Sequence, residues 1–231
     1  LCFSGRMTTE PQADDRRARG LRLVTVLLGL TVVSGMIDAV SFLGLNHVFT
    51  ANMTGNVLVL AFAAAGAVYF SVPHTVTSLA CFLAGAVIGG RVAVRYGGAR
   101  RTWVRVTLAV EAVLVGGAAA VALAAPDADG TLYAVIALTA FAMGLRNTTV
   151  VKLGVPDLTT TVLTRTLASL AADSRAGGGT GRRTPRRAAA VLAMPAGAVL
   201  GAWLVIHHGL GPPLLIAAGV PGLLALVASE R

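Results

Sequence analysis

The chain has 231 residues, of which 55% are hydrophobic and 13% charged, and its mean hydropathy is +0.77. A soluble domain typically carries about 25% charged residues, so this composition all but excludes an ordinary water-soluble globule. The formal net charge is +9, yet the arginines lie in loops between apolar stretches and form no basic face with interleaved aromatics, which argues against a nucleic-acid partner.

Long apolar runs follow one another along the whole chain. Each is close to the roughly 20 residues that a helix needs to cross about 30 Å of hydrocarbon. They lie at residues 21–45, 48–70, 75–95, 103–125, 131–151, 188–206 and 210–228. A further segment, 160–172, would form only about 20 Å of helix and carries Arg165, so we expect it not to span. We expect translation to begin at Met7 and the first run to be retained rather than cleaved as a signal peptide.

Most of the arginines form three clusters, in residues 16–22, 91–105 and 175–187. Loops rich in Lys and Arg face the cytoplasm, which places all three clusters on that side. An even number of crossings must then separate neighbouring clusters, and this holds if 48–70 enters the membrane and returns. The competing topology has seven or eight plain spans, because 48–70 is long enough to cross.

Two halves of the chain resemble each other. Residues 84–90 match 196–202 at an offset of 112, 54–56 fall on 164–166 at 110, and 35–38 fall on 144–147 at 109. With three crossings per half, the second half would lie upside down relative to the first, as in many secondary transporters.

The predicted fold is therefore an all-α polytopic integral membrane protein with about six transmembrane helices, two re-entrant or half-helical segments and an inverted internal repeat. We expect both termini to be cytoplasmic. The predicted organisation is a cytoplasmic tail at 1–20, a first membrane repeat at 21–125, an external loop at 126–130, and a second membrane repeat at 131–231 with a cytoplasmic Arg/Gly loop at 173–187.

Polar clusters interrupt the apolar pattern at equivalent places in the two halves, at 46–56 and 155–166. In inverted-repeat transporters, interrupted helices meet at the binding site, and their free N–H groups and positive dipole ends favour anions. Plain helix caps are the alternative reading. The candidate substrate-binding residues are Asp38, Asn52, Thr54, Asn56, Arg146, Asn147, Thr160, Thr161, Thr164 and Arg165.

Charged residues inside apolar runs cost about 3 kcal/mol or more and usually pair or line a polar path. Asp38 lies deep in the first run, and it would either pair with Arg146 or act on a substrate or proton. Glu111 would pair with Arg105 or Arg91, or carry a proton, so Asp38 and Glu111 are the candidates for proton coupling. Arg165 would reinforce anion binding at a re-entrant helix start, or else lie in a cytoplasmic loop.

Other motifs point to packing rather than chemistry. Small-residue faces at Gly85, Gly89, Gly197 and Gly201 predict close helix contacts. The histidines have no metal-ligand spacing, and no HExxH, GxSxG or Walker A motif is present. We therefore expect no enzyme activity, no metal and no cofactor.

Two stretches resemble the YoaK family of bacterial inner-membrane proteins, whose function is unknown. They are 35–56, which contains Asn52-Met53-Thr54-Gly55-Asn56, and 143–164, which contains Arg146-Asn147. The resemblance runs from about residue 21 to 228 and implies a polytopic protein of the inner (plasma) membrane. Arg146 and Arg165 depart from the family's usual uncharged residues, which tilts the expected solute towards anions.

These observations predict a small secondary transporter or permease for a small polar or anionic solute. A homodimer would suit a chain of this size. The alternative is a non-transporting membrane scaffold or regulatory partner whose arginine loops dock acidic proteins or lipids.

Overall fold

The computed structural model describes residues 10–67, 69–96, 98–126, 128, 130–154, 163–179 and 184–227. This part of the chain is helical, as predicted. Its elements are α1 (Glu10–Gly44), α2 (Met53–Ala64), α3 (Val72–Arg95), α4 (Arg100–Ala124), α5 (Thr131–Leu153), α6 (Leu163–Ala172), α7 (Thr184–His208) and α8 (Gly211–Val227).

Five of the described helices contain stretches long and apolar enough to cross a membrane. They are Val24–Gly44, Val72–Arg95, Arg100–Ala124, Thr131–Leu153 and Arg187–His208. The helices α2 and α8 are apolar but shorter. At 1.5 Å per residue, α2 is about 18 Å long and α8 about 26 Å, against roughly 30 Å of hydrocarbon. The chain is therefore a polytopic membrane protein.

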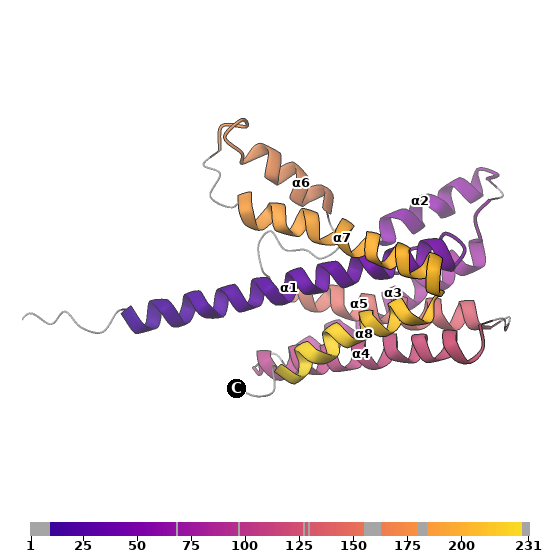
Figure 1. Cartoon of the computed structure of the whole chain (residues 1–231), viewed down its shortest axis with the longest axis horizontal. Coiled ribbons are helices and arrows are strands. Elements are labelled where there is room, and N and C mark those ends of the chain that lie inside the picture. The colour runs from indigo at the N-terminus through magenta and orange to yellow at the C-terminus, as the bar shows by residue number, and fades with distance from the viewer. Residues whose placement is uncertain are drawn as a thin grey trace, which may run out of the picture.

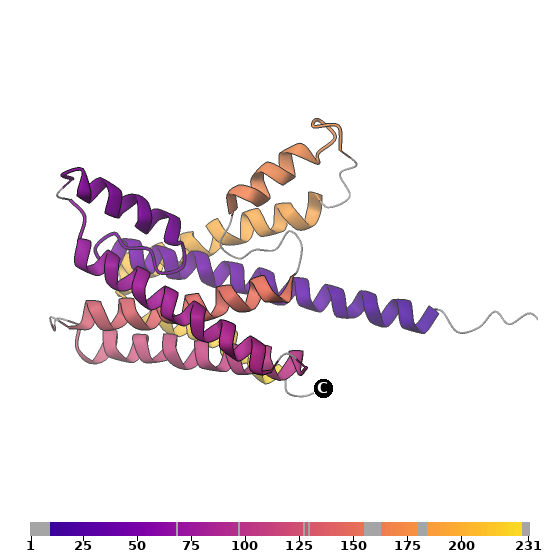
Figure 2. The same cartoon turned by 180° about the vertical axis from the view of Figure 1, so that it is seen from behind.

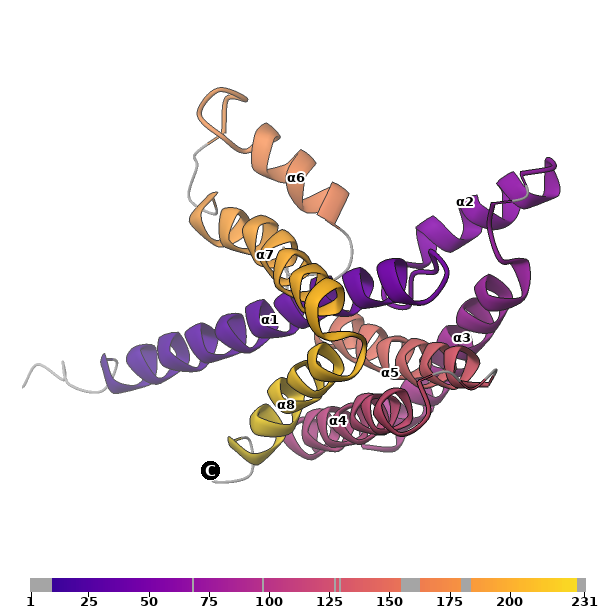
Figure 3. The ribbon, with the colours of Figure 1, turned by 45° about the vertical axis from the view of Figure 1, so that its right-hand side comes forward.

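The long helices form one bundle, from which α2 and α6 project (Figure 3). The chain leaves α1 and enters α3 at the same end of this bundle, so α2 does not run from one end of the bundle to the other (Figures 1 and 2). In the same way, α6 lies between the end of α5 and the start of α7 at the opposite end. The start of α1 and the end of α8 lie at that second end, and so do the end of α3, the start of α4, the end of α6 and the start of α7 (Figure 1).

Helix contacts pair off between the two halves of the chain. The most extensive ones join α3 to α5, α1 to α7 and α4 to α8. The two halves of the chain can be compared by matching α1 with α5, α2 with α6, α3 with α7 and α4 with α8. Under this matching, the α1–α7 contact corresponds to the α3–α5 contact, and the α4–α5 contact corresponds to the α1–α8 contact. Likewise α2–α3 maps onto α6–α7 and α3–α4 onto α7–α8, while α1–α5 and α4–α8 map onto themselves. The contact pattern thus has an approximate twofold symmetry.

Glycines lie where the paired helices approach most closely. A Cβ atom on Gly85 of α3 would collide with the carbonyl oxygen of Phe141 on α5, and one on Gly197 of α7 would collide with that of Val32 on α1. The two glycines are 112 residues apart, and the two residues that they approach, Val32 and Phe141, are 109 apart. The same offsets relate the two halves of the sequence. One turn further along, the same helices meet at Gly89 with Leu145 and at Gly201 with Met36. Small residues let helix backbones come this close in lipid, where van der Waals packing drives association.

Candidate functional site

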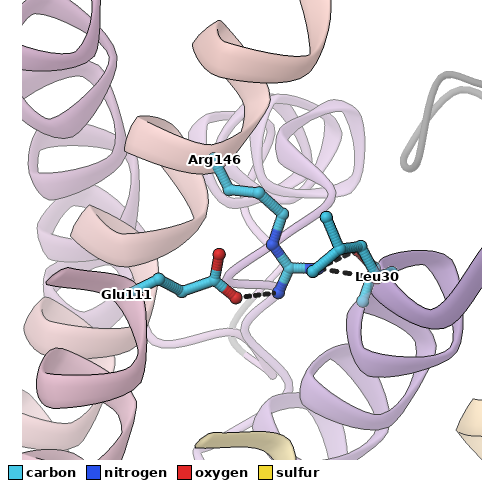
Figure 4. A network of polar contacts seen from close by, with 4 residues as sticks. Leu30, Glu111 and Arg146 are labelled. Carbon is cyan, nitrogen blue, oxygen red and sulfur yellow. Dashed lines mark hydrogen bonds and ion pairs between the residues drawn. The ribbon is translucent and has the colours of Figure 1, made fainter. Parts of the chain in front are cut away.

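A buried ion pair joins the middle of α4 to α5 (Figure 4). Arg146 Nη2 lies 2.7 Å from Glu111 Oε1, and the two side chains are 2% and 0% exposed. The second terminal nitrogen, Arg146 Nη1, donates to the carbonyl oxygen of Leu30 at 2.6 Å and to Ser34 Oγ at 3.0 Å. One guanidinium group therefore connects three helices, α1, α4 and α5.

This network keeps unused hydrogen-bonding capacity. Among the described residues, neither Arg146 Nε nor Glu111 Oε2 has a hydrogen-bond partner. Burying two charges is favourable only when their attraction and hydrogen bonds offset the lost hydration. Ionisable residues that face the interior of a membrane bundle commonly line a solute or proton path. The pair therefore marks the core of the bundle as a candidate site.

Asp38 lies one turn beyond Ser34 on the same face of α1 and is 6% exposed. Its Oδ1 accepts the backbone N–H groups of Ala51 at 2.9 Å and Asn52 at 3.3 Å, immediately before α2 begins. The side chain of Asn52, the N-cap residue of α2, makes no capping hydrogen bond. The carboxylate of Asp38 thus takes over part of the capping role from another helix.

The other carboxylate oxygen of Asp38, Oδ2, is buried and has no hydrogen-bond partner among the described residues, and the same holds for Thr50 Oγ1. Unsatisfied buried polar atoms are rare in folded proteins, and they commonly have a functional role. An oxygen acceptor and a hydroxyl group near the start of a half-length helix suit a proton or a small polar molecule.

Asn56 fixes the connection between α1 and α2. It is fully buried, and its Oδ1 accepts the N–H group of Phe49 at 2.9 Å. Its Nδ2 donates to the carbonyl oxygen of Phe49 at 2.6 Å and to Ser78 Oγ on α3 at 3.2 Å. Ser78 Oγ also donates to the carbonyl oxygen of Phe49, at 2.7 Å. Non-helical backbone within a membrane domain persists only when such partners satisfy it.

The structure corrects the expected ion pairs. Arg146 forms its ion pair with Glu111. The structure therefore does not bear out two of the alternatives considered from the sequence, a pair between Asp38 and Arg146 and a pair of Glu111 with Arg105 or Arg91. The reason is helix rotation: Glu111 and Arg146 face each other across the α4–α5 contact. Asp38 instead faces the loop that returns to α2.

The remaining predicted residues are spread more widely. Thr54 and Thr164 are exposed, and Asn147 is partly buried. Thr160, Thr161 and the side chain of Arg165 lie outside the described residues. Thr166, which matches Asn56 at the repeat offset of 110, is buried like its counterpart. Within the described part of the chain, α2 packs against α3 and α6 against α7, without contact between α2 and α6.

Sequence reasoning missed two serines that complete the site. Ser34 accepts a hydrogen bond from Arg146, and Ser78 joins α3 to the α1–α2 loop. Ser34 stands four residues before Asp38, on the same helical face, and that spacing was the available signal. In the described part of the chain, no group of three His, Cys, Asp or Glu residues comes together to hold a metal ion.

The fold defines a multi-pass transmembrane protein, and a buried polar network lies inside its helix bundle. Residues 26–227 match a family described as "Protein of unknown function (DUF1275)", and the chain belongs to that family. It is also 36% identical, over 153 residues, to the UPF0700 transmembrane protein YoaK of Bacillus subtilis strain 168. That alignment covers 64% of this chain and 66% of the relative. No solved structure matches.

Proposed function

We propose that this protein is a small secondary transporter or permease for a small polar or anionic solute in the bacterial inner membrane. The proposal rests mainly on three buried charged residues, Asp38, Glu111 and Arg146, which keep unpartnered atoms and lie on helices of both halves of the chain. A purely structural ion pair would be expected to satisfy more of its hydrogen-bonding groups, because each unsatisfied one is costly in lipid.

The proposed topology has six crossings, made by α1, α3, α4, α5, α7 and α8, with α2 and α6 as half-helical segments. The symmetric helix contacts support an inverted repeat. Arginines at the end of α3 and the start of α4, namely Arg95, Arg100 and Arg101, lie at the same end as the start of α1 and the end of α8, which favours a cytoplasmic location for that end (Figure 1).

Within this topology, Asp38 is the proposed proton-coupling residue. It already occupies the N–H groups before α2, so a free anion at that helix start would compete with its carboxylate. We therefore assign attraction of an anion to Arg146 and to the start of α6. Protonation of Asp38 at Oδ2 would remove the negative charge and so weaken the hydrogen bonds that Oδ1 accepts from the N–H groups of Ala51 and Asn52. This weakening links a proton to the conformation of the loop.

The transport test uses proteoliposomes that enclose a pH-sensitive dye, with formate, nitrate, phosphate and glycerol as external probes. Wild-type protein should move at least one probe, with a pH response that Asp38→Asn abolishes and an uptake rate that Arg165→Ala lowers. Arg105→Ala, which removes an exposed arginine of α4, is the matched control and should retain the wild-type rate. Uptake that is unaffected by Asp38→Asn and Arg165→Ala would refute this assignment.

Topology is tested with single cysteines in a cysteine-free background. Ser71 and Asp129 should be labelled from outside, and Gly98 and Gly178 from the cytoplasm. If Ser71 is labelled from the cytoplasm, the segment containing α2 crosses the membrane and the inverted repeat fails.

A further inference from the structure

A basic groove lies where the end of α3, the start of α4 and the end of α5 meet. It consists of two adjoining hollows of about 680 and 320 Å³, and Val94 and Lys152 line both. Arg91 and Arg95 of α3 line the larger hollow, and Arg100 of α4 lines the smaller one. The ion-pair network of the bundle core contributes no residue to this groove.

The positive charge of the groove is uncompensated. The residues lining the two hollows include no Asp or Glu. Arg100 donates from Nη2 to the carbonyl oxygen of Leu153 at 2.9 Å, which ties the start of α4 to the end of α5. Arg91, Arg95 and Lys152 are exposed and have no hydrogen-bond or ion-pair partner within the described residues. Converging cations repel one another, so a bound anion with several oxygens would stabilise them together.

An unpartnered donor also lies beside the groove. The indole of Trp103, a lining residue of the smaller hollow, is 6% exposed, and its Nε1–H has no acceptor among the described residues. A buried Trp N–H group usually finds a partner, and Trp is enriched at the level of the lipid headgroups. The first turn of α4 begins here without a side-chain cap, which adds a positive dipole end.

The groove's surroundings select a lipid as the source of the anion. It lies at the ends of three helices that are long enough to cross the membrane. Apolar side chains are exposed along its walls: Val94 is 78% exposed, and Val87 is 52% exposed. Basic pockets between transmembrane helices with adjoining apolar surface are typical binding sites for anionic lipid headgroups. We propose that this groove holds the phosphate of an anionic phospholipid, whose acyl chains lie against Val87 and Val94.

The proposal is tested by native mass spectrometry of the full chain in detergent, titrated with phosphatidylglycerol and, separately, with phosphatidylcholine. Wild-type protein should retain phosphatidylglycerol in preference to phosphatidylcholine. Each cation near a membrane surface contributes about fivefold to binding, so Arg95→Gln/Lys152→Gln should weaken phosphatidylglycerol binding by about thirtyfold. Arg91→Gln alone should weaken it by about fivefold.

The matched control is Arg105→Gln/Arg175→Gln, which removes the same charge from exposed positions that do not line the groove. It should bind phosphatidylglycerol as wild type does. Equal weakening by both double variants would show a general charge effect and overturn the site. If glycerol 3-phosphate displaces the lipid at equal concentration, the groove is a soluble phosphate site, which overturns the assignment to lipid. The melting temperature of each variant in phosphatidylcholine alone identifies any variant that has lost its fold.

Discussion

Replacing Glu111 by Gln should strongly destabilise the protein. The substitution keeps the size of the side chain but leaves the cation of Arg146 in the bundle core without its counter-ion at 2.7 Å. Removing one partner of a buried ion pair costs about 3–5 kcal/mol. At about 2–4 °C per kcal/mol for a chain of this length, the apparent melting temperature in detergent should fall by roughly 6–20 °C. Arg146→Gln should show a loss of similar size, because it leaves the Glu111 carboxylate buried and unpaired.

The double variant separates the pair from the two single effects. Glu111→Gln/Arg146→Gln removes both charges together, so it should be more stable than the sum of the single losses predicts, by about 0.5–3 kcal/mol. Unfolding in mixed micelles of detergent and sodium dodecyl sulfate measures the three free energies. Arg105→Gln, on the same helix as Glu111 but exposed, is the control and should stay within about 0.5 kcal/mol of wild type. The ion pair would be refuted as a structural element by either of two results: each single variant changes the free energy of unfolding by less than about 1 kcal/mol, or the loss in the double variant equals the sum of the two single losses.

Three further substitutions test the other contacts. Asp38→Ala should destabilise the protein by about 1–3 kcal/mol, since two N–H groups before α2 lose their acceptor, and limited proteolysis should then cut the α1–α2 loop faster. Asn56→Ala should lower the free energy of unfolding by a similar amount, because the loop loses its hydrogen bonds to Phe49. Thr54→Ala, on the exposed face of the same helix, should leave stability unchanged, so the melting temperatures of the two variants show whether Asn56 holds the loop. Gly197→Ala should disrupt the α1–α7 contact and lower folded yield in size-exclusion chromatography, whereas Gly90→Ala, where an added methyl group meets nothing within 4 Å, should leave it unchanged.

The main helices were predictable because hydropathy and helix length are local properties. The predicted run at 103–125 corresponds to α4, Arg100–Ala124, and the run at 131–151 to α5, Thr131–Leu153. The second run was less accurately predicted: residues 48–70 read as one apolar stretch, but the helix within it is only Met53–Ala64. The difference arises in the loop before α2. There the side chains of Asp38 and Asn56 form hydrogen bonds with backbone N–H and C=O groups that would otherwise pair within a helix.

The candidate site was only partly predictable. Asp38, Glu111 and Arg146 could be selected because a charge in an apolar run is costly and therefore needs a partner. Which residue partners which depends on the rotation of each helix about its axis and on where two helices cross. A shift of one residue turns a side chain by about 100°, which is enough to move Arg146 from one neighbour to another.

Taken alone, the sequence determined that this chain is a helical membrane protein with two similar halves, because apolar run length, charge placement and repeated spacing are all properties of the chain itself. The tertiary structure alone decided that Arg146 joins Glu111 to the backbone of α1, that Asp38 holds the start of α2, and that four basic side chains from three helices converge on one groove. Those contacts form between residues far apart in sequence, so they depend on how the helices pack, and close approach at residues such as Gly85 and Gly197 sets that packing.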